Sequence, residues 1–314
     1  MKEVFAQRYV TIPSGQLERV EVHAPGVVQN PHDPQAQWSA KGHGAAKKDW
    51  VGYKVQVAES FEDAASQREE GEPKPHFLTS IVTQDAIESD EAGLAATFEQ
   101  QRAAGLESPS ELYVDGAYIC AAALTEAAQE QRELLGPAQP SAARAGLDPA
   151  FRIEAFEIDV NQRRAVCPAG HENTQCSRLE EKDTGKVSYR FEFSTHCHSC
   201  ALKEQCVGAA QKHRTLVVGE HHNHLQARRR EQQSANFQER MHQRNAIEGT
   251  QSELVRAHGL RRARYRGKAK VDLQNQLIGT ACNIKRWIKV MAWELRQRAE
   301  DGCESRLQTA MAMP

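Results

Sequence analysis

The sequence predicts an α/β protein, and two observations support this prediction. Residues 50–58 (WVGYKVQVA) alternate apolar and polar side chains with a period of two, which is typical of a half-buried strand. An apolar run at 77–82 supplies a hairpin partner for it. Residues 111–135 read as a short apolar strand, a glycine turn after Asp115 and a helix from Ala121. Strands that alternate with helices are the layout of α/β domains.

Two further helices follow from composition and periodicity. Residues 90–104 favour a helix that ends at Gly105. Residues 271–298 carry apolar side chains at spacings of three and four, so we expect an amphipathic helix. The stripe consists of Leu277, Ala281, Ile284, Ile288, Met291 and Leu295.

The net charge of −2 over 314 residues conceals a strong asymmetry. Residues 1–150 hold 12 Lys and Arg against 23 Asp and Glu, whereas residues 151–314 hold 28 against 19. Such a distribution predicts an anionic partner for the second half. No run of 18 apolar residues occurs, which excludes a membrane-spanning helix, and the first residues lack a secretory signal. We therefore expect a cytoplasmic, nucleoid-associated protein with reduced thiols and no membrane partner.

Changes of composition predict five segments. Residues 1–49 read as an exposed linker, because Gly, Pro, His and Lys dominate from residue 24 onward. Residues 50–135 form the first part of the α/β domain, residues 136–225 an inserted Cys-rich β module, residues 226–299 a helical part with a basic segment, and residues 300–314 a disordered tail.

The cysteine spacing predicts a structural zinc site in the inserted module. Cys197 and Cys200 are separated by two residues, Cys206 follows, and Cys167 lies about thirty residues upstream. Two distant arms that deliver thiolates suit a tetrahedral zinc site, and four thiolates leave no open position for chemistry. Buried reduced thiols without a metal are the competing interpretation. The alternative ligands are His171, Cys176, His196 and His198.

Residues 256–270 (RAHGLRRARYRGKAK) predict a nucleic-acid interface. The segment contains seven basic residues and no acid, and an aromatic residue lies among them. Basic side chains at this density neutralise phosphates, and the aromatic ring can stack on a base. A solvated helix flank is the competing interpretation. The DNA-binding candidates here are Arg256, Arg261, Arg262, Arg264, Tyr265, Arg266, Lys268 and Lys270.

Two carboxylates are candidate metal ligands. One face of a helix would carry an acid beside the basic segment, since its residues are Arg244, Glu248, Ser252 and Arg256. An acid there repels phosphate unless a divalent cation bridges the two groups, although an ion pair between Glu248 and Arg244 is an alternative. Asp115 lies at a strand end, where ligands of α/β sheets bind, or else it simply forms a turn.

Several of these segments together resemble bacterial insertion-sequence transposases of the DDE type. The segments are WVGYKVQVAES, LYVDGAYI, CPAGH, CHSC and IEGTQSELVRAHGLRRARYRGKAKVDLQNQLIGTACNIKR. The last is the most specific, because in this family a glutamate, a GLRRARYRG block and an N-[IL]-K-R helix mark the end of the catalytic domain. Asp115 and Glu248 match the second aspartate and the final glutamate of the family, and Arg244 matches an arginine that precedes the glutamate.

The resemblance implies a fold, an activity and partners. The fold is a ribonuclease-H-like mixed sheet flanked by helices, in which three carboxylates hold two Mg²⁺ ions for phosphoryl transfer. The expected partners are transposon ends, target DNA and further copies of the chain in a homo-oligomer, and no nucleotide cofactor is needed. A non-catalytic DNA-binding protein and a metal-dependent nuclease of the same fold are the alternatives.

The first aspartate of the family has no clear match. The resemblance places it on an opening strand ahead of the Gly-Tyr-Lys segment at 52–54. The only aspartates ahead of that segment are Asp33 and Asp49. Both lie in the polar linker, and neither follows an apolar strand. We therefore expect a truncated or split transposase that lacks the first strand and has reduced or no activity alone.

Overall fold

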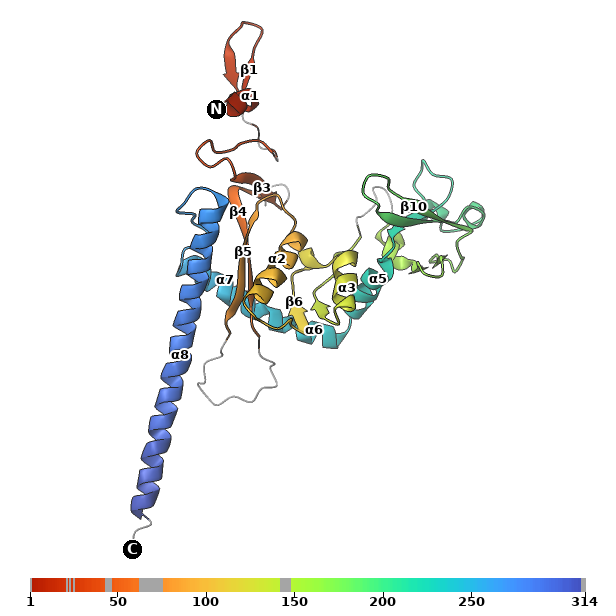
Figure 1. Cartoon of the computed structure of the whole chain (residues 1–314). Coiled ribbons are helices and arrows are strands. Elements are labelled where there is room, and N and C mark those ends of the chain that lie inside the picture. The colour runs from red at the N-terminus through yellow and green to blue at the C-terminus, as the bar shows by residue number, and fades with distance from the viewer. Residues whose placement is uncertain are drawn as a thin grey trace. The chain divides into compact units, whose positions relative to one another are not determined.

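The computed structural model shows a mixed α/β protein that divides into two compact units (Figure 1). The first unit consists of Met1–Ser108 and Asn245–Pro314, and the second unit of Pro109–Arg244. The predicted segment boundaries at 135 and 225 do not coincide with these units. The structure describes residues 2–20, 22, 24, 26–42, 47–61, 76–141 and 148–311.

A small hairpin begins the first unit. Helix α1 (Lys2–Arg8) leads into β1 (Tyr9–Thr11), which pairs antiparallel with β2 (Leu17–Arg19). The side chains of both strands are exposed, so this hairpin contributes little to a core.

The main sheet of the first unit has the order β3-β4-β5, and all its strands are antiparallel. Strands β4 (Lys48–Glu59) and β5 (Leu78–Asp85) confirm the predicted hairpin. Strand β3 (Gln37–Lys41) was not predicted, because five residues in a segment rich in Gly, Pro and His give almost no periodic signal. The interpretation of 24–49 as an exposed linker is therefore wrong at β3, which hydrogen-bonds along β4.

Three helices cover this sheet. Helices α2 (Asp90–Ala103) and α8 (Lys268–Met311) pack on β5, and α7 (Ala246–Arg256) contributes Leu254 to the core. A Cβ atom at Gly279 of α8 would lie 2.5 Å from the Ile81 Cδ1 atom, so the glycine allows a close approach of helix and sheet. The core is completed by Leu78, Ile81 and Cys282.

Helix α8 differs from its prediction in two respects. It continues to Met311, whereas we expected disorder from residue 300; residues 300–311 contain no proline that would stop a helix. Its predicted apolar stripe faces away from the sheet, and Leu277 and Leu295 are 61% and 59% exposed. The face toward the sheet instead carries Val271, Asn275 and Cys282.

Amide side chains form hydrogen bonds with main-chain groups of β5, one of the two outer strands of the sheet. The Asn283 side chain accepts a hydrogen bond from the Leu78 N–H (2.8 Å) and donates one to the Leu78 carbonyl (2.9 Å). The Ile81 N–H donates to Gln100 Oε1 at 2.8 Å, and Gln276 Nε2 donates to the Ile81 carbonyl. Side chains of α2 and α8 thus replace a neighbouring strand at these two residues.

Arg286 of α8 connects three elements of the first unit. Its guanidinium donates to Glu59 of β4 at 3.1 Å, to Thr250 of α7 at 2.7 Å and to the carbonyl of His76 at 2.7 Å. It also pairs with Glu253 of α7 at 3.2 Å. The Glu59 side chain is only 7% exposed, and Arg286 supplies the opposite charge beside it.

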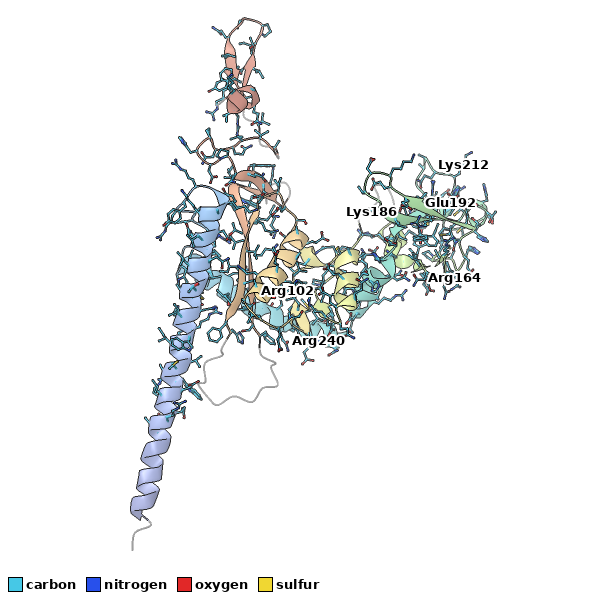
Figure 2. All side chains as sticks on the ribbon, viewed as in Figure 1. Arg102, Arg164, Lys186, Glu192, Lys212 and Arg240 are labelled. Carbon is cyan, nitrogen blue, oxygen red and sulfur yellow. The ribbon has the colours of Figure 1, made fainter. Side chains whose placement is uncertain are left out.

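The second unit contains a parallel strand pair with helices packed around it. Strand β6 (Glu111–Tyr113) pairs with β7 (Glu133–Leu135), and α3 (Ala121–Gln129) connects them. Helix α5 (His222–Glu231) packs on α3, and its Arg228 donates to the Leu134 carbonyl at 2.7 Å. Helix α6 (Ala235–His242) supplies Arg240, labelled in Figure 2, which binds both carboxylate oxygens of Glu133 at 2.8 and 2.7 Å.

The Cys-rich module has its own apolar core within the second unit. It comprises the hairpin β8-β9 and the antiparallel sheet β10-β11-β12. Phe156, Phe191 and Phe193 are at most 1% exposed and form the centre of the core. The strands are β8 (Glu157–Asp159), β9 (Arg164–Val166), β10 (Gln175–Glu180), β11 (Val187–Glu192) and β12 (Thr215–Gly219). The short helices are η3 (Pro149–Phe151), η4 (Ile153–Ala155), η5 (His196–His198) and α4 (Lys203–Cys206).

Among the residues described, every helix is too short or too polar to cross a lipid bilayer.

The contacts of Arg286 predict a large loss of stability when it is replaced. Arg286→Met leaves the buried Glu59 carboxylate without its cation, which should cost about 3 kcal/mol of unfolding free energy. Arg298→Met is the matched control, because Arg298 lies on the same helix with its side chain 76% exposed. Urea unfolding followed by circular dichroism measures both. Equal midpoints for the two variants would contradict the role of Arg286.

Candidate nucleic-acid and metal sites

Asp115 lies two residues after the end of β6, at the carboxyl end of the parallel strand pair. Its side chain is exposed, and Oδ1 accepts a hydrogen bond of 2.6 Å from the N–H of Gly116. It thereby begins the short helix η2 (Gly116–Tyr118). Asp115 therefore forms a turn and also presents a carboxylate at a strand end, so the two interpretations of the sequence are compatible.

Gly116 allows this turn to approach the chain that follows β7. A Cβ atom at Gly116 would lie 2.7 Å from the carbonyl oxygen of Pro137 and 2.6 Å from the side-chain nitrogen of Gln139. The first of these neighbours is main chain, which cannot rotate away as a side chain can. Asp115 is thus followed by a position that is too narrow for any larger residue.

Glu248 lies in the first turn of α7, and its side chain is exposed. The helix also carries Ser252 and Arg256, so three of the four residues predicted to share one face lie on one helix. Arg244 precedes it in η6 (Gln243–Asn245), a 3₁₀ turn. Asp115 and Arg244 belong to the second unit, whereas Glu248 belongs to the first.

Residues 257–267 of the basic segment form the loop that connects α7 to α8, whereas Arg256 ends α7, and Lys268 and Lys270 lie in the first turn of α8. Gln274 of α8 fixes the loop: its side chain accepts from the N–H of Arg264 and donates to the carbonyl of Arg262, both at 2.8 Å. Gly259 and Gly267 bend the chain at the two ends, with φ of 70° and 88°. Gln274 is buried, so the main chain of the loop is held from inside.

The side chains of this loop point away from that anchor. Residues 261–266 are all exposed, including Tyr265. In the described part of the chain, no carboxylate lies within 4.0 Å of the guanidinium groups of Arg261, Arg262, Arg264 or Arg266. Lys268 differs from these four, because its ammonium group pairs with Asp85 at 3.1 Å.

Asp33 is buried, although it lies in a polar segment of the sequence. It is only 7% exposed, just before β3, and Oδ1 accepts a 2.8 Å hydrogen bond from the Tyr53 hydroxyl. Burial, together with this hydrogen bond, raises the pKa of Tyr53, which therefore remains the donor. Asp49 lies on β4 and is exposed. The two aspartates ahead of the Gly-Tyr-Lys segment are thus in opposite environments.

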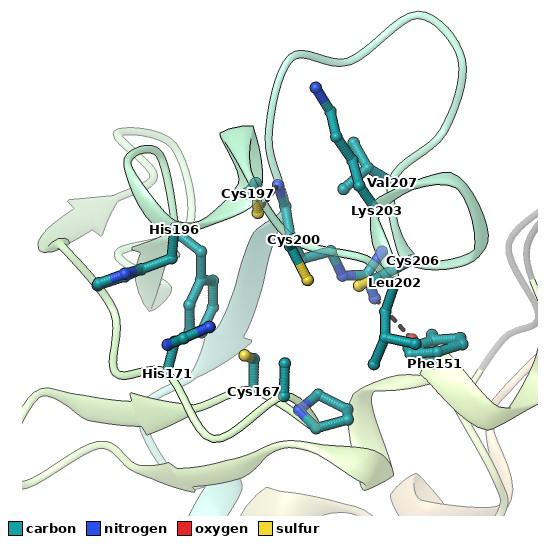
Figure 3. A pocket seen from close by; sticks show the side chains of 14 residues that line it. Phe151, Cys167, His171, His196, Cys197, Cys200, Leu202, Lys203, Cys206 and Val207 are labelled. Atoms are coloured by element: carbon teal, nitrogen blue, oxygen red, sulfur yellow. Dashed lines mark hydrogen bonds between the residues drawn. The ribbon is translucent and has the colours of Figure 1, made fainter.

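Four cysteines line one cavity in the Cys-rich module, and Figure 3 shows them around it. Cys167 comes from the turn after β9, and Cys197, Cys200 and Cys206 come from the segment that contains η5 and α4. The cavity has a volume of about 20 Å³, which is enough for one water-sized particle. These are the four residues predicted as zinc ligands.

Two of the four alternative zinc ligands line the cavity and two do not. His171 and His196 line it and stack on each other, with ring centroids 4.8 Å apart. Cys176 and His198 are not among the residues that line it. Cys176 lies on β10 and packs against the apolar core of the module.

A second cluster has a geometry that could hold a metal ion, but its charges oppose one. Within the described residues, ligand atoms of Glu253, His258 and Cys282 lie within 4.8 Å of one another, a spacing that the four cavity thiols do not meet. Lys285 donates to Glu253 at 2.7 Å, and this hydrogen bond lowers the pKa of Glu253 to about 2. Because Arg286 also binds this carboxylate, its charge is already balanced, and we assign the cluster to packing.

Comparison with known proteins gives one match. The family described as a transposase DDE domain matches residues 166–288, which run from β9 into α8. The matched segment includes the cavity cysteines, Glu248 and the basic loop, but Asp115 lies outside it. No curated protein and no solved structure matches the chain. The family match confirms the resemblance inferred from the sequence.

The narrow space at Gly116 predicts a specific cost of substitution. Gly116→Ala places a methyl group against the Pro137 carbonyl and should lower the unfolding free energy by roughly 1–3 kcal/mol. Gly249→Ala is the control, since Gly249 lies in the interior of α7 with no atom within 4 Å of an added Cβ. There alanine should raise stability by about 0.5–1 kcal/mol. If urea unfolding shows that both substitutions stabilise the protein, the contact with the Pro137 carbonyl does not restrict the side chain at residue 116.

Proposed function

We propose that this chain, whose residues 166–288 belong to the transposase DDE domain family, cuts and joins DNA by metal-dependent phosphoryl transfer. The observation that carries the proposal is the exposed carboxylate of Glu248 on α7, the helix that leads directly into an acid-free basic loop. The ribonuclease-H-like fold is part of this proposal and rests on the family resemblance, because β3-β4-β5 and β6-β7 are separate sheets in the two units.

Asp115 and Glu248 are the proposed ligands of Mg²⁺. Both are exposed carboxylates, and hard oxygen donors of this kind suit magnesium, which keeps part of its water shell. When bound, two such ions activate a water or 3′-hydroxyl and stabilise the leaving oxygen of the phosphodiester. The hydrogen bond from Gly116 orients Asp115, so its free oxygen remains available as a ligand.

Asp33 is the proposed third carboxylate. The resemblance places this residue ahead of the Gly-Tyr-Lys segment, and of the two aspartates there only Asp33 is buried and hydrogen-bonded by a residue of that segment. A ligand whose rotamer is fixed in this way is more suitable than an exposed side chain on a strand. On this proposal the chain carries all three carboxylates. A first aspartate that is missing from this chain is the alternative, and a test of Asp33 distinguishes the two.

Arg261, Arg262, Arg264 and Arg266 are the proposed contacts to the DNA backbone. Their guanidinium groups are exposed, and Gln274 fixes the main chain that carries them, which lowers the entropy lost on binding. Tyr265 is exposed among them and can stack on a base or sugar. Lys268 contributes less, because Asp85 already neutralises it.

Substitution of the proposed carboxylate ligands should abolish DNA cleavage and strand transfer but leave DNA binding intact. Asp115→Asn, Glu248→Gln and Asp33→Asn should each reduce Mg²⁺-dependent cleavage and strand transfer at least 100-fold, since each removes a charged metal ligand. Affinity for the same DNA, measured by fluorescence anisotropy without metal, should be retained. Asp49→Asn is the matched control for Asp33 and should keep full activity.

Three results would revise this assignment. Unchanged cleavage by Asp33→Asn would remove that residue from the site. Cleavage without joining would favour a metal-dependent nuclease. Tight binding by the unmodified chain, with no cleavage at any Mg²⁺ concentration, would favour a non-catalytic DNA-binding protein or a chain that needs a further segment.

The basic loop predicts a change in salt dependence. The double substitution Arg264→Ala/Arg266→Ala should reduce the slope of log Kd against log salt by about 2, because two phosphate contacts and their counterions are lost. Arg298→Ala removes an exposed arginine elsewhere on α8 and should leave the slope unchanged. Anisotropy titrations between 50 and 200 mM salt, roughly the range in which such contacts are measured, provide the test. Equal slopes for all three proteins would exclude the loop as the interface.

A further inference from the structure

We infer that Cys167, Cys197, Cys200 and Cys206 bind one zinc ion, which joins the two turns of the Cys-rich module that line the cavity. This inference concerns residues that the proposed DNA chemistry does not use, and it does not depend on that chemistry. It rests on the convergence of four thiols from two distant segments on one small cavity.

The first turn is built to present Cys167. The Gly170 N–H donates to the Cys167 carbonyl at 2.8 Å, and the Cys167 N–H donates to the His171 carbonyl at 2.9 Å. Gly170 has a φ of 81°, which other residues rarely adopt, so the glycine is needed to close the turn. The result is a tight loop with a thiol at its base, which is how zinc sites commonly receive a ligand.

The second arm is equally ordered. The Cys197 N–H donates to the Phe193 carbonyl at 3.2 Å, the Cys200 carbonyl accepts from Lys203, and the Cys206 N–H donates to the Leu202 carbonyl at 3.0 Å. The segment therefore folds back on itself and returns three thiols to the same side. Cys197 and Cys206 are buried, and Cys200 and Cys167 are half-buried, so an ion among them would be largely shielded from water.

Arg214 provides charge compensation. Its main-chain N–H donates to the Cys197 sulfur at 3.4 Å. Its side chain is 5% exposed, lines the same cavity and donates to the Phe151 carbonyl at 3.0 Å. Binding of Zn²⁺ displaces four thiol protons and leaves a centre of charge 2−, so a buried cation beside it is favourable.

Reduced core thiols are the competing interpretation, and the cavity argues against them. Protein cores are close-packed, and apolar side chains that merely filled the module would close the space between the two turns. A zinc–sulfur distance of about 2.3 Å requires the thiols to be closer together than they are here, so we expect the two turns to close on the ion. Because four thiolates fill the coordination sphere, the ion stabilises the module and takes no part in the reaction.

Metal content and cobalt spectroscopy test the inference on the full chain. The protein purified under reducing conditions should contain one zinc per chain, and Co²⁺ exchanged into it should show intense thiolate charge-transfer bands and the visible bands of a tetrahedral site. Removal of the ion by a thiol-compatible chelator should lower the Tm, and stoichiometric Zn²⁺ should restore it, whereas Mg²⁺ should not.

Substitutions identify the ligands. Cys167→Ser and Cys200→Ser should each lose the metal and the thiolate bands in part or in full, whereas Cys176→Ser, His171→Ala and His196→Ala should keep both. The cobalt spectrum of the unsubstituted chain decides the question even if a cysteine variant fails to fold. A chain without zinc and without thiolate bands would overturn the inference, and so would metal retention by Cys167→Ser or metal loss by Cys176→Ser.

Discussion

The first unit depends on the ion pairs and hydrogen bonds of the Arg286 side chain, which is only 15% exposed. This side chain connects β4 through Glu59, α7 through Thr250 and Glu253, and α8, from which it comes. A buried carboxylate such as Glu59 is tolerated only with its partner in place, so these elements keep their arrangement together. Since Glu248 and the basic loop belong to the same α7-loop-α8 piece, one ion-pair network fixes both the proposed metal ligand and the proposed DNA contact.

The two basic blocks that carry the family resemblance have different physical roles. The Asn283-Ile284-Lys285-Arg286 block is structural, because Asn283 binds the main chain of Leu78, Lys285 binds Glu253 and Arg286 binds Glu59. The basic block between Leu260 and Gly267 instead presents exposed cations from a main chain anchored by Gln274. Both blocks are rich in positive charge, and only the positions of their partners distinguish a cation that folds the protein from one that is available for DNA.

The parts of the structure that depend on local patterns could be predicted from the sequence, and those that depend on long-range pairing could not. Period-two alternation identified β4, and capping signals identified α2. Strand β3 pairs with β4, and the Asp33 carboxylate accepts a hydrogen bond from Tyr53, which is twenty residues away in the sequence. Such pairings leave no local signal. The four cavity cysteines could be predicted to lie together, because the spacing of cysteines in zinc sites links segments that are distant in the sequence. The sequence did not predict that the apolar stripe of α8 faces away from the sheet, since Asn275, rather than a leucine, faces the sheet.

The amide side chains along β5 affect how this sheet meets other molecules. An outer strand with free main-chain groups is a template for a strand of another chain, and proteins usually block it with lysine, proline or a bulge. The interior of β5 contains neither lysine nor proline. At Leu78 and Ile81, however, the donors and acceptors are already used by Gln100, Gln276 and Asn283. An incoming strand would have to break those bonds before making its own, so intermolecular β-sheet growth, and with it aggregation, is suppressed at this edge.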